Sequence, residues 1–144
     1  KGLVGLVERA LLRGGADAVA PLRGHLTAGD GKARARCLRV LARMAPPLGA
    51  TTAELIAALD DADPAVRRAV ARALGRRREA GVEAALAAAL PRADEAERRV
   101  LVEALGKVGS AEALASLAGV APGDADLERR RTRARLMVER TAQR

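Results

Sequence analysis

Arginine recurs along this chain at intervals of 33, 31 and 31 residues. A guanidinium group donates several hydrogen bonds in one plane, so a column of arginines could hold an anionic ligand or bridge main-chain carbonyls. In the first three copies an aspartate stands four residues before the arginine, where it could cap the same helix. We therefore expect a structural role, bridging caps or carbonyls of the neighbouring repeat, for Arg34, Arg67, Arg98 and Arg129.

Eight further basic residues fall into three other columns on the same predicted helices. Lysine and arginine bind phosphates through their charge, and this affinity falls as salt rises. The alternative is a solvated face held by local pairs four residues apart, such as Arg99 with Glu103. The candidate residues for binding an anionic partner are Arg39, Arg43, Arg68, Arg72, Arg76, Arg99, Lys107 and Arg130.

No combination of residues supports catalysis or metal binding. The chain has one histidine, His25, and one cysteine, Cys37. A zinc site needs about four ligands at suitable spacing, and a nucleophilic pair needs an orienting group. The stretch Gly29-Asp30-Gly31-Lys32 lacks the further glycine, the hydroxyl residue and the preceding strand of a phosphate-binding loop. We expect no catalytic residue, no metal and no cofactor.

The composition favours thin layers of helices over a globule. Hydrophobic residues make up 49% of the 144 residues, and Phe, Tyr and Trp do not occur. The core must therefore consist of Leu, Val and Ala, with many contacts of modest area. A chain without aromatic side chains cannot stack on unpaired bases, which argues against sequence-specific recognition of single strands.

The net charge of +8 is unevenly distributed: residues 1–46 carry +6, residues 47–121 carry −1 and residues 122–144 carry +3. An anionic partner should be attracted mainly to the two ends. No apolar run could span a bilayer and no signal peptide is evident. The single cysteine allows no internal disulfide. We expect a cytoplasmic protein without membrane contact, from a GC-rich bacterium by its Ala, Arg and Gly content.

These residues lie in a repeat of two amphipathic helices. Asp63-Pro64 predicts a helix start, because Asp caps the first turn and Pro is tolerated there. Thr51 with Glu54 resembles a capping box, and Ser110 is a further cap. The predicted core leucines are Leu22, Leu55, Leu86 and Leu117 in first helices, and Leu41, Leu74, Leu105 and Leu136 in second helices.

The pattern predicts one leading helix and four helix pairs in a single domain, residues 1–144. The predicted helices are 2–13, 15–27, 32–44, 52–60, 64–77, 79–90, 95–108, 110–120 and 126–141. The repeats span about 1–13 (partial), 15–44, 52–77, 79–108 and 110–141. Gly75 and Gly106 are predicted to end helices in the left-handed conformation. The opening residues 2–7 are apolar, so we expect a contact surface there, or a longer protein packed before residue 1.

The segment Asp63-Pro64-Ala65-Val66-Arg67-Arg68-Ala69-Val70-Ala71-Arg72-Ala73-Leu74-Gly75 resembles the HEAT-like repeat named after phycobilisome lyases. The resemblance is close at residues 52–77, good at 79–108 and looser elsewhere. Glu97 and Glu128 replace the apolar residue at Val66, which we expect to loosen the packing. The resemblance implies a right-handed all-α solenoid whose neighbouring copies bury one another's apolar faces. The lyase name carries no activity over to this chain.

Two functions follow as hypotheses. The first is a non-enzymatic binding or scaffolding module whose partner is another protein or domain. The second is an accessory domain that binds RNA backbones for a larger enzyme, because the basic cluster at residues 128–135 is similar to HEAT-like segments of bacterial RNA methyltransferases. A HEAT-type DNA glycosylase is disfavoured, since such enzymes use aromatic and acidic residues around the extruded base.

Overall fold

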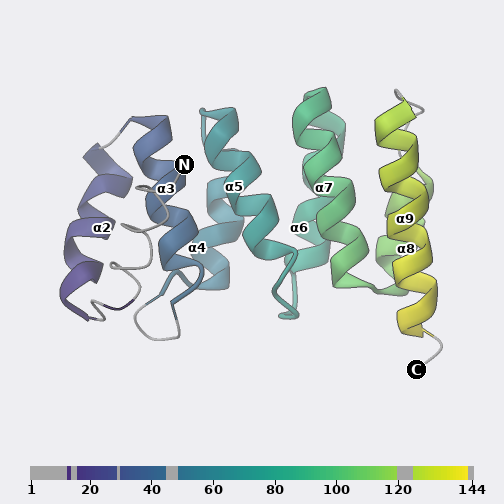
Figure 1. Ribbon diagram of the computed structural model, residues 1–144, viewed down its shortest axis with the longest axis horizontal. Coiled ribbons are helices and arrows are strands. Elements are labelled where there is room, and N and C mark those ends of the chain that lie inside the picture. The colour runs from purple at the N-terminus through teal and green to yellow at the C-terminus, as the bar shows by residue number, and fades with distance from the viewer. Residues whose placement is uncertain (1–12, 14–15, 29, 45–48, 120–124, 143–144) are drawn as a thin grey trace. The chain divides into compact units, whose positions relative to one another are not determined.

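The computed structural model describes residues 13, 16–28, 30–44, 49–119 and 125–142, which contain helices and turns and no strand (Figure 1). This confirms the all-α fold class. The leading helix expected at residues 2–13 lies outside the described residues apart from Arg13. The chain divides into two compact units, which we call the N-terminal unit (residues 1–73) and the C-terminal unit (residues 74–144).

The described residues of the N-terminal unit form helices and one short 3₁₀ turn. Helix α2 spans Ala16–Ala28 and packs against α3, which spans Gly31–Leu41. Helix α4 (Thr52–Ala57) continues into the 3₁₀ turn η1 (Ala58–Asp60), and α5 spans Pro64–Leu74 at the end of the unit. The predicted ranges agree with these bounds to within three residues at each end.

Helix starts are determined by local side chains, as the sequence predicts. Thr51 and Glu54 form a capping box at α4. Asp63 accepts a hydrogen bond from the amide of Ala65 at 2.7 Å, directly before the first residue of α5, Pro64. Each contact satisfies a first-turn amide that has no partner within its helix.

The C-terminal unit is built of two layers. Helix α6 (Val82–Ala89) is followed by the 3₁₀ turn η2 (Leu90–Arg92) and by α7 (Glu95–Val108). Helices α8 (Ala111–Ala118) and α9 (Ala125–Ala142) form the next pair. Helices α7 and α9 lie side by side in one layer, with α6 and α8 behind them in the other (Figure 1). The site described below lies between α7 and α9.

Two further caps begin helices in this unit. Ser110 caps α8, as predicted, by accepting from the amide of Ala113 at 3.0 Å. Asp94 and Glu97 form a second capping box at the start of α7. Glu97 is only 5% exposed, and its carboxylate accepts from the amide of Asp94 at 3.1 Å. The glutamate at this position therefore completes a helix start.

The core leucines follow the predicted columns, with one exception. Leu22, Leu55, Leu86 and Leu117 are buried, and so are Leu41, Leu74 and Leu105. The prediction for Leu136 is wrong, because its side chain is 50% exposed. The buried residues of α9 are instead Leu127, Ala134 and Val138. Leu136 lies two residues after Ala134, which turns it by roughly 200° around the helix, away from the buried stripe.

The left-handed ends predicted at Gly75 and Gly106 are also wrong. Among the described residues, only Gly81 and Gly109 have positive φ values, of 86° and 75°. Gly106 lies within α7, where an added Cβ would be 2.5 Å from the Cβ of Ala134. At Gly75 an added Cβ would be 2.8 Å from the Cα of Ala104. These two glycines are required by close helix approach.

The same spacing explains the position of Leu136. Ala104 of α7 lies against Gly75, and Ala134 of α9 lies against Gly106. Gly106 itself follows Ala104 by two residues. Leu136 follows Ala134 by the same two residues, so it occupies the place in α9 that Gly106 occupies in α7. A leucine there prevents another helix from approaching α9 as closely as α9 approaches α7.

Candidate functional site

Three members of the predicted structural arginine column bind turns between helices. Arg34 reaches a turn of the neighbouring repeat, whereas Arg67 and Arg98 bind the turns directly before their own helices. Arg34 on α3 donates to both carboxylate oxygens of Asp61, at 3.0 and 2.8 Å. Arg67 on α5 donates to the main-chain carbonyls of Asp61 and Ala62, at 2.7 and 3.0 Å. Arg98 on α7 donates to the carbonyl of Ala93 at 3.0 Å. These bonds satisfy acceptors in the turns between first and second helices.

Arg129 is placed differently. Its side chain is 72% exposed, and its guanidinium lies 3.5 Å from the carboxylate of Asp126 on the same helix. An exposed pair of this kind contributes little to stability. The outward direction of Arg129 follows from the same change of spacing that exposes Leu136.

Arg34 and Asp61 join α3 to the turn before α5 within the N-terminal unit. The side-chain hydrogen bonds from Arg34 lower the pKa of Asp61 most, against the opposing effect of its partial burial. The amide of Asp63 also donates to this carboxylate, at 2.8 Å. All of these donors favour the charged form of Asp61.

We expect this pair to contribute stability that acid removes. A carboxyl group with a lowered folded-state pKa stabilises the fold above its unfolded pKa of about 4, and the contribution disappears as pH falls through the folded value. Asp61→Asn should therefore lower the melting temperature at pH 7, and its gap from the wild type should close below about pH 4. Circular dichroism melts from pH 7 to 2 measure this. In an Arg34→Gln background the substitution should have much less effect, and an unchanged gap there would contradict the pairing.

Five candidate binding residues lie on α3 and α5 or directly after these helices. Arg39, Arg43 and Arg72 are exposed, Arg68 is half-buried, and the exposed Arg76 follows α5 in the C-terminal unit. Binding of an anionic partner by these five residues remains a prediction.

Arg99, Lys107 and Arg130 come together between α7 and α9. Arg99 pairs with Glu95 at 2.5 Å and with Asp126 at 3.4 Å. Arg130 pairs with the same Asp126 at 2.8 Å, and hydrogen bonding to Arg130 is the main cause of the lowered pKa of Asp126. The predicted column Arg68/Arg99/Arg130 and the predicted column Arg43/Arg76/Lys107 thus both contribute to this cluster, and each contributing side chain has a carboxylate neighbour.

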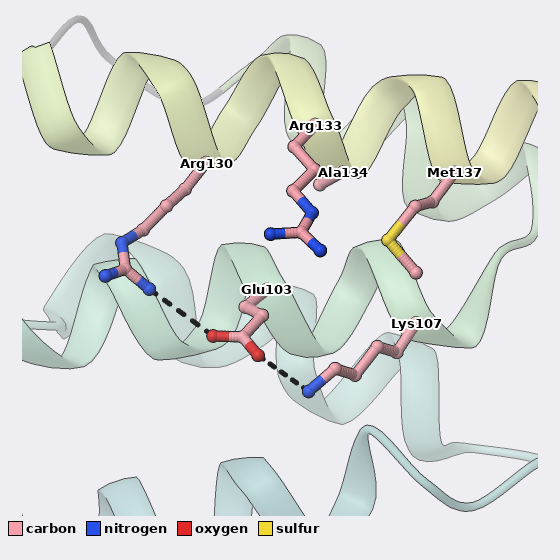
Figure 2. Close-up of a pocket in the computed structure, with 6 residues that line it drawn as sticks. All are labelled: Glu103, Lys107, Arg130, Arg133, Ala134 and Met137. Atoms are coloured by element: carbon pink, nitrogen blue, oxygen red, sulfur yellow. Dashed lines mark hydrogen bonds and ion pairs between the residues drawn. The ribbon is translucent and has the colours of Figure 1, made fainter.

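A groove of about 170 Å³ lies beside this cluster. We call it the α7/α9 groove, and Figure 2 shows it. One carboxylate oxygen of Glu103 lies 2.6 Å from Lys107 Nζ, and the other lies 3.4 Å from an Arg130 guanidinium nitrogen. The lining residues are Glu103 and Lys107 from α7, and Arg130, Arg133, Ala134 and Met137 from α9.

Arg133 and Met137 are not among the eight candidate binding residues predicted from the sequence, although Arg133 belongs to the basic cluster at residues 128–135. Arg133 extends from α9 toward α7 above Glu103, and Met137 extends in the same direction one turn later (Figure 2). Arg133 forms no hydrogen bond or ion pair within the described part of the chain. Arg130, Arg133 and Met137 are spaced i, i+3 and i+7, so they lie along one flank of a helix. That spacing was visible in the sequence, but the facing helix was not.

The single histidine and the single cysteine lie on different helices of the N-terminal unit. His25 is exposed on α2, while Cys37 is buried in α3, where burial raises the pKa of its thiol. Among residues 13, 16–28, 30–44, 49–119 and 125–142, no three His, Cys, Asp or Glu side chains are grouped to hold a metal ion. None of the helices described there is long and apolar enough to cross a membrane.

Comparison with known families agrees with the geometry. The profile of the family described as HEAT repeats matches residues 19–101 and, in a second overlapping match, residues 52–137. No curated protein matches the chain significantly. The family match does not distinguish the lyase-type subgroup, which stays a prediction from residues 63–75. Since the two matches together cover most of the sequence, the chain belongs to the HEAT-repeat family of α-solenoids.

Proposed function

We propose that this chain is a non-catalytic module that binds another protein through the α7/α9 groove. HEAT repeats generally mediate protein interaction or scaffolding. The observation that carries the proposal is the groove itself, whose lining combines three cations, one carboxylate and the apolar Met137. Met137 is 39% exposed, so a partner that covers it removes apolar surface from water.

The mixture of groups in the groove favours a protein partner over a nucleic acid. Glu103 lies between Lys107 and Arg130 and would repel a phosphate placed at the centre of the groove. Asp126 does the same beside Arg99 and Arg130. A polypeptide can match this alternation residue by residue, whereas a nucleic-acid backbone presents phosphates of one sign only.

A second candidate function is binding of an RNA backbone, as an accessory domain of a larger enzyme such as an RNA methyltransferase. Helix α9 favours it, because its 18 residues include six arginines and three acids. Arg133, Arg135 and Arg140 are exposed on this helix. Such binding would rest on charge alone and would weaken steeply with salt.

Site-specific cross-linking separates the two functions. A photo-reactive amino acid replaces Met137 in the groove, and a matched variant carries it at Ala84, which is exposed on α6 in the other layer. We expect an adduct at position 137 that protease removes, that resists ribonuclease and that is absent at position 84. The captured protein, purified, should bind the chain with an affinity that falls with salt much less steeply than that of an RNA, because part of the contact is apolar.

An RNA-binding role would give the opposite result. The adduct at position 137 would then be ribonuclease-sensitive and would disappear as salt is raised. Equal protein adducts at positions 137 and 84 would contradict the assignment to the groove.

A further inference from the structure

We propose that the α7/α9 groove recognises an acidic peptide segment through one carboxylate and one apolar side chain. This rests on the proposed protein-binding function and adds the chemistry of the partner. The carboxylate would bind Arg133, and the apolar side chain would lie against Ala134 and Met137.

The charges of the groove select an acidic partner. Glu103 already has two cationic neighbours, Lys107 and Arg130, at its two carboxylate oxygens. Arg133 lines the same groove and has no ion-pair partner within the described residues. The lining therefore has an excess of two positive charges, and Arg133 is the cation available to a ligand. A guanidinium binds a carboxylate through two parallel hydrogen bonds, which gives direction as well as attraction.

The size of the groove limits the apolar part of the ligand to one side chain. A cavity of about 150 Å³ holds a molecule as large as benzene. The α7/α9 groove has about 170 Å³, enough for the end of a Leu, Met or Phe side chain. Met137 suits such a contact, because its thioether is flexible and polarizable and adapts to different shapes.

A second copy of this chain fits the groove poorly. The chain carries +8, and the cluster beside the groove is already rich in arginine. Two such surfaces would repel one another, whereas a segment of opposite charge is attracted over several ångströms. A helical ligand would need an apolar residue and, one turn away from it, a glutamate or aspartate.

The test uses the full chain and a defined peptide. A fluorescein-labelled helical peptide of glutamate and alanine, with one central leucine, is titrated with the chain at about 0.1 M salt and followed by anisotropy. Replacing Arg133 with Gln should weaken binding at least about tenfold, because it removes a charge-assisted pair. The matched control is Arg135→Gln, which removes another exposed arginine of α9 outside the groove lining and should change affinity less than about twofold.

The apolar contact is tested separately. Met137→Ala, and a peptide with serine in place of the leucine, should each weaken binding about fivefold without changing its salt dependence. Because the three substituted side chains are exposed, circular dichroism should show unchanged folding in every variant.

Three results would overturn the inference. Equal losses for Arg133→Gln and Arg135→Gln would mean that only the overall charge matters. A 12-nucleotide RNA that binds more tightly than the peptide, and loses affinity in Arg133→Gln, would assign the groove to phosphates. If no peptide binding is seen while position 137 still cross-links to a protein, the acidic segment is wrong but the protein-binding function stands.

Discussion

Replacing Leu105 with alanine should lower the free energy of unfolding by about 2–5 kcal/mol, the usual loss for a buried leucine. Leu105 has no exposed surface and lies on α7, which packs against α6, α8 and α9. A cavity at this position removes contacts from several helices at once. Because the chain has no aromatic residue, urea unfolding is followed by circular dichroism rather than by fluorescence.

The matched control is Leu136→Ala. Leu136 is the residue 31 positions later and belongs to the same column in the sequence, but half of its side chain is exposed. Its replacement should lower the free energy of unfolding by less than about 1 kcal/mol. Equal losses at the two positions would mean that α9 buries a different face from the one described.

Replacing Gly106 with alanine should destabilise the fold by about 1–3 kcal/mol, although alanine is the better helix former by about 1 kcal/mol. The added Cβ would lie 2.5 Å from the Cβ and 2.7 Å from the Cα of Ala134. The second contact is with backbone, so α9 as a whole must move away from α7. Urea unfolding of the variant measures the loss.

Gly24 provides the opposite control. It lies within α2, and an added Cβ there would meet no atom of the described residues within 4 Å. Gly24→Ala should therefore stabilise the chain by about 0.5–1 kcal/mol, through helix propensity alone. A gain at both glycines would show that α7 and α9 do not approach as closely as described. A loss of stability in both variants would show that other residues pack against α2 at Gly24.

The α7/α9 groove and the close contact at Gly106 have one origin. Because Gly106 lets α9 approach α7, Arg130 reaches Glu103, and the same flank of α9 brings Arg133 and Met137 over α7. The ion pairs across the groove are partly exposed, so they contribute modestly to stability. Their main effect is to hold the orientation of side chains that a partner would contact.

Features that depend on neighbouring residues in the chain were determined by the sequence itself. The starts at Thr51, Asp63 and Ser110 follow from a capping side chain and the amides of the next turn, which lie within three residues. The buried leucines through Leu117 follow from helical spacing, because one stripe of each helix must leave water. The all-α class and the HEAT family follow from the repetition of both signals.

What depends on contacts between distant segments was decided only by the tertiary structure. The sequence predicts Gly106 as a helix end and Leu136 as core, since a glycine commonly ends a helix and the column places a leucine there. The prediction for Gly106 fails because α7 continues to Val108 and ends at the left-handed Gly109. The prediction for Leu136 fails because α9 packs on α7 one residue out of the expected spacing, with Ala134 against Gly106. The same packing selects Arg133 and Met137, rather than the columns of arginine alone, as the lining of the groove. Side-chain periodicity defines the faces of one helix, but the facing helix determines which of them forms a site.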